Sequence, residues 1–116
     1  MSIDVRKFLI KMPYDEFDLD FDFGGPLTEL PPGTTHIVSN TLSAIKWPRT
    51  QPTNASDATS EILFSNIGVI LSPENTSLRI RIQGGTDGYD YKITIRVVFD
   101  DASRLENEFY IRVRQE

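Results

Sequence analysis

The residues of this chain that could do chemistry are concentrated in the stretch DEFDLDFDFGG, residues 15–25. Asp18, Asp20 and Asp22 occupy every second position there, and Phe or Leu fills each position between them. Carboxylates at this spacing could bind a metal ion, attract a basic partner, or form the solvent-exposed face of a β-strand. The neighbouring residues help to choose among these three uses.

A metal site is disfavoured by the residues around the carboxylates. A calcium loop needs a glycine directly after its third carboxylate ligand, because the chain turns sharply around the ion. Here Phe23 stands between Asp22 and Gly24. A loop wrapped around an ion would also expose Phe17 and Phe21, which need burial. We therefore expect no bound metal and no other cofactor.

The aspartates can instead form ion pairs with cationic side chains on other predicted strands. Such an ion pair between neighbouring strands contributes about 0.2–1 kcal/mol. A row of carboxylates on a sheet face could also attract a basic neighbouring protein in an assembly. Both uses, ion pairing within the chain and contact with a partner, stay open. The candidate cations are Arg79, Arg81, Lys92, Arg96, Arg112 and Arg114.

The chain offers little to a catalytic mechanism. It has no cysteine, which excludes thiolate catalysis and Cys-ligated zinc. His36 is the only histidine, and no G-x-S-x-G nucleophile elbow is present. A glycosidase pair needs a buried acid beside a cleft, for which a small sandwich has little room. We therefore predict no enzymatic activity, no catalytic residue and no small-molecule substrate.

The glycine-rich segment QGGTDGYDYKIT, residues 83–94, predicts a turn rather than a phosphate site. A phosphate-binding loop needs a Lys-Ser/Thr pair and a following helix N-terminus, whereas a strand pattern follows here. We expect its three glycines to adopt positive φ angles in a hairpin connection. Asp87 or Asp90 would then accept backbone hydrogen bonds.

Trp47 lies at the end of a predicted strand, next to a polar loop near 48–60. With Arg49 and Tyr14 it could form an exposed aromatic patch for a sugar or a protein. Large aromatic side chains are mostly buried, so a tryptophan that closes one end of the fold is the other interpretation. The sequence leaves both interpretations open.

Alternation of apolar and polar residues places these side chains on strands. The clearest alternation covers residues 17–23, 78–83, 91–99 and 109–114, and further strands are expected near 4–11, 35–46 and 61–71. Turn residues stand between them, at 24–26, 30–35, 72–77, 84–90 and 100–107. No helix of useful length is predicted. Many short strands separated by turns indicate an all-β, antiparallel β-sandwich, with a small barrel as the second choice.

Composition narrows the class of protein. A chain of 116 residues is the size of one domain. Its net charge of −5 argues against nucleic-acid binding, which usually needs a basic surface. No segment approaches the ~20 apolar residues of a transmembrane helix, and the first residues lack the apolar core of a signal peptide. We therefore expect no membrane partner, and a protein made and retained in a cytoplasm or in an assembly built there.

The order of the motifs resembles that of a known family. DEFDLDFDF is followed by PPGTTHIVSNTLSA, then by a variable middle, and the chain closes with IQGGTDGYDYKITIRVVFDDASRLENEFYIRVRQE. This order resembles the phage fiber-tail adaptor proteins, which are small structural proteins of tailed bacteriophages. The resemblance covers residues 13–116. The best-matched positions are Gly84, Gly85, Thr86, Gly88, Tyr91, Lys92, Thr94, Arg104, Glu106, Arg112 and Arg114.

Two departures from the family pattern stand out. Ser103 occupies a position where glycine is usual, and the middle of the chain, residues 45–77, is longer than expected and carries its own strand. Neither departure breaks the fold that the resemblance implies. The longer middle does put any inherited contact surface in question.

The resemblance implies a single immunoglobulin-like β-sandwich over residues 1–116, located in the virion. Its role would be non-enzymatic, joining other phage structural proteins or further copies of itself. The alternative is a small carbohydrate- or receptor-binding module that uses Trp47 and the 48–60 loop. The segment 1–11 is apolar enough to form an edge strand or an exchanged arm. The partner contacts we expect are Asp18, Asp20, Asp22, Trp47, Arg112 and Arg114.

Overall fold

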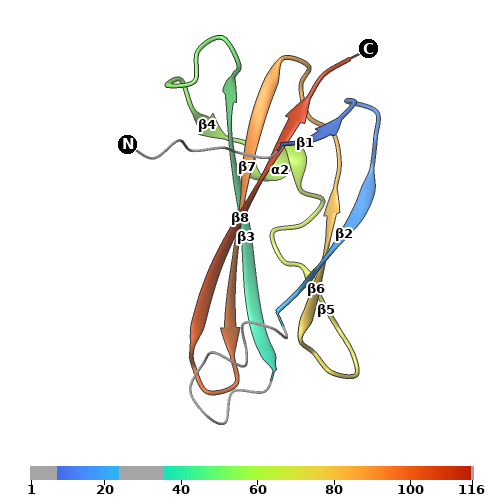
Figure 1. Cartoon of the computed structure of the whole chain (residues 1–116), viewed down its shortest axis with the longest axis vertical. Coiled ribbons are helices and arrows are strands. Elements are labelled where there is room, and N and C mark those ends of the chain that lie inside the picture. Colours follow the sequence, from blue (N-terminus) through green and yellow to red (C-terminus); the bar gives the residue numbers. More distant parts are fainter. Residues whose placement is uncertain (1–7, 24–35, 116) are drawn as a thin grey trace.

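A computed structural model describes residues 8–23 and 36–115, which form two packed β-sheets (Figure 1). The five-stranded sheet has the order β1-β8-β7-β3-β4, and the three-stranded sheet has the order β2-β6-β5. The strands are β1 (Phe8–Lys11), β2 (Phe17–Asp22), β3 (Ile37–Pro48), β4 (Ser56–Asp57), β5 (Val69–Leu71), β6 (Ser77–Ile82), β7 (Tyr89–Phe99) and β8 (Arg104–Val113). Helix α2 (Thr59–Ile62) is a single turn. The prediction of an all-β sandwich is confirmed.

The strands with the clearest alternation are those that the structure contains as β2, β6, β7 and β8. Along β2 the aspartates are exposed, and the apolar side chains between them are half-buried. The predicted turns at 24–26 and 30–35, and the first part of the predicted strand at 4–11, lie outside the described residues. In the part of the chain that is described, no helix has the length and apolar content needed to cross a membrane.

Strand β1 is the one departure from antiparallel pairing among the named strands. It lies at the edge of the five-stranded sheet and runs parallel to β8, with Leu9 opposite Ile111. Parallel neighbours cannot be joined by a hairpin. Here the first and the last described strands are far apart in the sequence but adjacent in the sheet. The prediction of an edge strand at 1–11 is confirmed for residues 8–11.

Two local predictions were wrong. The glycine-rich segment at 84–90 is not a hairpin connection, because β6 belongs to the three-stranded sheet and β7 to the five-stranded sheet. The predicted strand at 61–71 contains the end of α2, an isolated bridge from Leu63 to Ile82, and only three residues of β5. Turn residues show where a chain bends, but they carry no information about which strand it pairs with next.

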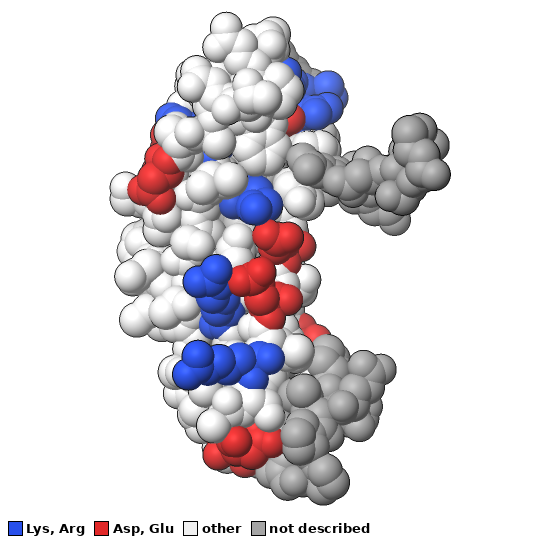
Figure 2. All heavy atoms as spheres, turned by 90° about the vertical axis from the view of Figure 1, so that its left-hand side faces the viewer, with Lys and Arg blue, Asp and Glu red and all other residues white. Residues whose placement is uncertain are grey.

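Charges of both signs are interspersed on the outer surface. Across β7 and β8, Lys92 Nζ lies 3.2 Å from Glu108 Oε2, and Arg96 Nε lies 2.7 Å from Glu106 Oε1. On the side of the molecule shown in Figure 2, blue and red side chains likewise lie next to each other. Such pairing relieves like-charge repulsion along the strands.

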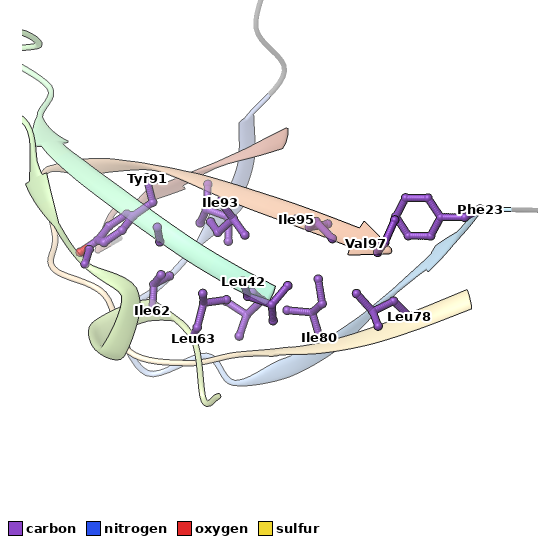
Figure 3. Close-up of a cluster of buried hydrophobic side chains, with 14 of the residues drawn as sticks. Phe23, Leu42, Ile62, Leu63, Leu78, Ile80, Tyr91, Ile93, Ile95 and Val97 are labelled. Carbon is purple, nitrogen blue, oxygen red and sulfur yellow. The ribbon is translucent and has the colours of Figure 1, made fainter. Parts of the chain in front are cut away.

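The hydrophobic core lies between the two sheets (Figure 3). Its main row comes from alternate positions of β7, each at most 1% exposed, and three positions of β6 face it at 0%. Burial of each such side chain contributes about 1.5–3 kcal/mol. Ile62 of α2 is also fully buried, so the short helix closes one end of the core. The two rows are Tyr91, Ile93, Ile95, Val97 and Phe99, and Leu78, Ile80 and Ile82.

Candidate interaction surfaces

The row of aspartates on β2 is paired with arginines of β6. Asp20 stands opposite Arg79 and Asp18 stands opposite Arg81 in the antiparallel register. Arg79 donates from Nε and Nη2 to the two oxygens of Asp20, at 2.8 and 3.0 Å. Arg81 donates to Asp18 at 3.1 Å and to Glu16 at 3.0 Å. The hydrogen bonds from Arg79 lower the pKa of Asp20, so this carboxylate stays ionised well into the acid range.

Arg79 and Arg81, two of the six predicted cations, form ion pairs with these aspartates. Lys92, Arg96 and Arg112 lie on β7 and β8, in the other sheet, and they pair with carboxylates of that sheet. The expectation that they might answer the aspartates of β2 is therefore wrong for these three. The outer faces of the two sheets of a sandwich point in opposite directions, so their charges cannot meet.

Three exposed apolar side chains occur between the end of α2 and the start of β5. Phe64 is 69% exposed, Ile67 56% and Val69 61%. We call these residues the apolar column. Sequence reasoning missed them as contact candidates, because it assigned the whole segment 61–71 to one strand and had no register to show which of its side chains face outward.

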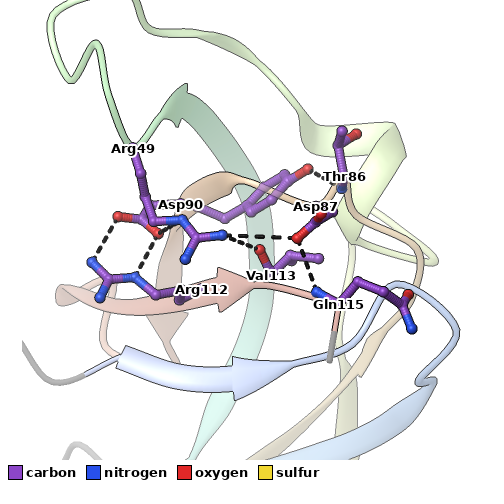
Figure 4. A network of polar contacts seen from close by, with 8 residues as sticks. Arg49, Thr86, Asp87, Asp90, Arg112, Val113 and Gln115 are labelled. Carbon is purple, nitrogen blue, oxygen red and sulfur yellow. Dashed lines mark hydrogen bonds and ion pairs between the residues drawn. The ribbon is translucent and has the colours of Figure 1, made fainter.

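A second polar cluster occupies the outer face of the five-stranded sheet (Figure 4). Asp90 is 3% exposed and accepts two hydrogen bonds from Arg112, at 2.9 and 3.0 Å. Arg49 Nε lies 3.8 Å from the same carboxylate, and Arg49 Nη2 donates to the carbonyl of Val113 at 2.9 Å. The hydrogen bonds that Arg112 donates to Asp90 raise the pKa of Arg112. The cluster joins β7, β8 and the start of the 48–60 loop.

The glycine-rich connection has the positive φ angles that the sequence predicted. The φ angles of Gly84, Gly85 and Gly88 are 57°, 98° and 91°. A Cβ atom at Gly84 would lie 2.7 Å from the carbonyl oxygen of Glu61 in α2, so the backbone can approach the helix only at a glycine. Asp87 does accept a backbone hydrogen bond, from the amide of Gln115 beyond β8.

A polar network fastens the same connection to α2. Tyr91 donates to the carboxylate of Glu61 and accepts from the amide of Thr86 at 2.7 Å. Lys46 Nζ donates to Glu61 at 2.6 Å. Burial opposes the ionisation of Glu61, but the hydrogen bonds from its neighbours outweigh burial and lower its pKa. Burial, with the bond to Glu61, raises the pKa of Tyr91 to about 12.

Lys11 ties the edge strand to this connection. It is 1% exposed, and its ammonium donates to the carbonyl oxygens of Met12 at 2.9 Å and of Gly84. Burial lowers the pKa of Lys11, and nearby carboxylates oppose that shift. The side chain of Lys11 therefore points inward and binds the glycine-rich connection. Its charge does not protect the exposed edge of the sheet from pairing with another strand.

The residues considered for chemistry lie in pairwise polar contacts. His36 Nδ1 lies 3.5 Å from Asp100 Oδ2, and the imidazole side chain is 41% exposed. Within residues 8–23 and 36–115, no group of three or more acidic or histidine side chains is placed to hold a metal ion. The surfaces described above are therefore held together by salt bridges and hydrogen bonds that serve the fold.

Comparison with protein families decides the class of this protein. The family model described as podophage GP4 fiber-tail adaptor protein gp77 matches residues 11–112. The chain belongs to this family. Searches of curated proteins and of solved structures found no match. The family resemblance predicted from the motifs is thereby confirmed.

The family match encloses the surfaces that could serve an adaptor. It begins at Lys11 and ends at Arg112, so it includes the acidic strand β2, the apolar column and the Asp90 cluster. It also spans the longer middle of the chain. The features described here therefore belong to the part of the chain that resembles the adaptor family.

Five of the six predicted contact residues lie on strands, and these five are divided between two different faces. Asp18, Asp20 and Asp22 are on the outer face of the three-stranded sheet. Trp47 stands opposite Asp90 in the register of β3 and β7, which puts its indole on the outer face of the five-stranded sheet near Arg112.

Trp47 itself presents little surface to a ligand. Its side chain is 8% exposed, whereas Tyr14 is 95% exposed. The tryptophan is therefore buried, but on the outer face of the five-stranded sheet and outside the core cluster, so it does not close one end of the fold as the second interpretation had it. Arg114, just beyond β8, is exposed.

Proposed function

We propose that this chain is a non-enzymatic adaptor of a phage tail that joins neighbouring virion proteins through fixed surfaces of its sandwich. The observation that carries the proposal is the match of the adaptor family to residues 11–112, nearly the whole described fold. In this proposal the chain resides in the virion, and residues 1–116 act as one immunoglobulin-like unit. Its partners are other tail proteins, with no nucleic acid, membrane or small-molecule substrate involved.

The strand order supports the immunoglobulin-like part of this proposal. An immunoglobulin sandwich has strands C, F and G in one sheet and strands B, E and D together in the other. Here β3, β7 and β8 are neighbours in one sheet, and the order β2-β6-β5 forms the other. Counting β2 as strand B and β8 as strand G reproduces this arrangement.

The polar contacts support a role in which rigidity matters. Arg112, Lys46 and Lys11 each hold a neighbouring element through side-chain hydrogen bonds. An adaptor must keep its surfaces in fixed relation, because shape complementarity at an interface is lost when its elements move. The alternative of a carbohydrate-binding module gains no support from the buried Trp47.

The proposal can be tested with phage particles. A phage carrying this gene with an early stop codon should produce particles without the chain, and these should lack the tail parts that attach through it. Addition of the purified protein should restore those parts and infectivity, as restoration of the gene does. Full infectivity of particles that lack the chain would contradict the proposal.

A further inference from the structure

We propose that the outer face of the three-stranded sheet, together with the apolar column, is the docking face for a neighbouring tail protein. The partner surface would present apolar side chains flanked by lysine or arginine. This inference rests on the proposed adaptor function and names the surface and the chemistry through which the adaptor would act.

The first observation concerns the position of Phe64. Leu63 pairs with Ile82, and both side chains are buried in the core, at 2% and 0% exposed. Successive side chains of an extended segment point to opposite sides, so Phe64 points outward. Its amide donates to the carbonyl of Arg81 at 3.1 Å, which puts the phenyl ring beside that arginine on the outer face.

The second observation places Val69 on the same face. Val69 stands opposite Arg79 in the register of β5 and β6, and directly opposite side chains of neighbouring strands share one face. Arg79 is two residues from Arg81 along β6, a separation of about 7 Å. Phe64 and Val69 therefore flank β6 on the same side, at two levels of the sheet.

The outer face thus has three parallel columns of different chemistry. Phe64 and Val69 of the apolar column lie on one side of β6, the arginines lie on β6, and the carboxylates lie on β2. We call the last the carboxylate column. Its members are Glu16, Asp18, Asp20 and Asp22.

The exposure of the apolar column indicates a binding surface. Single apolar residues on a protein surface are ordinary, but a contiguous group beside ordered charges is typical of interaction sites. Phe64, Ile67 and Val69 are each more than half exposed and occur within six residues of sequence. Exposed aromatic and aliphatic side chains of this kind serve as the anchors of interfaces.

The charges on this face indicate the partner. Glu16, Asp18 and Asp20 share the two arginines Arg79 and Arg81, so the side next to β2 carries excess negative charge. On the five-stranded sheet, in contrast, Asp90, Glu106 and Glu108 are each matched by a cation. A basic partner surface complements the excess, whereas a second copy of a chain with a net charge of −5 does not.

Binding to tail particles that lack this protein tests the inference directly. Purified wild-type protein and variants would be titrated onto particles from the stop-codon phage. The double variant Phe64→Ser/Val69→Ser should bind at least about tenfold more weakly than the wild type, because it removes the apolar anchors. The variant Asp18→Asn/Asp20→Asn should also bind more weakly, and its binding should depend less on salt.

Matched controls separate this face from the other one. Ile45→Thr changes an exposed apolar residue on the outer face of the five-stranded sheet and should bind like the wild type. Glu106→Gln removes a carboxylate from that sheet and should also leave binding unchanged. Thermal unfolding should show that every variant is folded, because Phe64, Val69 and Ile45 are exposed side chains.

A photo-crosslinking residue at position 64 identifies the occupant independently of the affinities. A crosslink to a basic surface of another tail protein, absent from a control at position 45, supports the inference. Crosslinking to a second copy of this chain overturns it, as does unchanged binding of the Phe64→Ser/Val69→Ser variant while the wild type binds. If the wild type itself does not bind the particles, that result contradicts the proposed adaptor function and not only the choice of docking face.

Discussion

Asp90 and Arg112 form a two-bond ion pair across β7 and β8, at 2.9 and 3.0 Å, in which the Asp90 side chain is only 5% exposed. Replacement by Asp90→Asn removes the negative charge and leaves two arginines facing a neutral amide. We expect a loss of about 1–3 kcal/mol of unfolding free energy, because a buried polar group loses a charged partner. Urea denaturation followed by tryptophan fluorescence measures this loss.

The control for this prediction is Glu106→Gln, which breaks the exposed pair with Arg96. Solvent weakens a pair of this kind, so its loss should change the urea midpoint much less than Asp90→Asn does. Equal shifts for both variants would mean that burial of Asp90 contributes nothing to the strength of its pair.

The glycine-rich connection provides a second prediction. Gly84→Ala should destabilise the fold more than Gly88→Ala, although both glycines have positive φ angles. A Cβ at Gly84 would meet the Glu61 carbonyl at 2.7 Å, whereas a Cβ at Gly88 meets nothing within 4 Å. Gly88→Ala should cost about 1–2 kcal/mol from backbone strain alone. Thermal unfolding of both variants measures the difference, and a smaller loss for Gly84→Ala would refute the close approach to α2.

Tyr91 provides a prediction about alkaline pH. Its pKa is raised to about 12 in the fold and is about 10 in an unfolded chain. The folded state therefore holds this proton more tightly, and the stability it provides is complete below pH 10 and is lost as pH rises through 12. The loss should amount to about 2–3 kcal/mol.

Comparison of Tyr91→Phe with the wild type isolates this contribution. The variant should be less stable at pH 7, since Glu61 loses a hydrogen bond, and the gap should narrow between pH 10 and 12. Tyr14→Phe changes an exposed tyrosine and should retain the full alkaline loss of the wild type. A gap that stays constant with pH would contradict the role of the Tyr91 proton.

The ion pairs of β2 and β6 provide a fourth prediction. Asp20 and Arg79 are 48% and 47% exposed, so solvent screens their attraction. Asp18→Asn/Asp20→Asn should therefore change the urea midpoint less than Asp90→Asn does, and added salt should reduce the difference from the wild type. A large loss that persists in high salt would show that these aspartates serve mainly the stability of the fold.

The sequence alone predicted the parts of the fold that depend on local pattern. The alternation of Asp18 with Phe17 and Leu19 predicted a half-buried strand, because side chains of a strand point alternately to two sides. The same argument predicted the inward row that begins at Tyr91. The turn chemistry of Gly84 predicted its positive φ angle.

The parts that sequence reasoning missed depend on which elements meet in space. Whether Arg112 faces the aspartates of β2 or Asp90 depends on the sheet to which β8 belongs, and no local pattern encodes that. The parallel pairing of β1 with β8 could not be predicted either, because no local pattern shows which strands become neighbours. Phe64 and Val69 come together only because the chain between them follows β6, so their common face has no signal in the sequence.

We propose that this chain occupies a phage tail and joins neighbouring proteins there. Electron cryomicroscopy of the intact particle tests it most directly, because the two sheets, of five and three strands, should be recognisable in the density. We expect copies of the sandwich in the tail, with the outer face of β2, β6 and β5 buried against another protein. Particles of full infectivity whose tails contain no copy of the chain would contradict it.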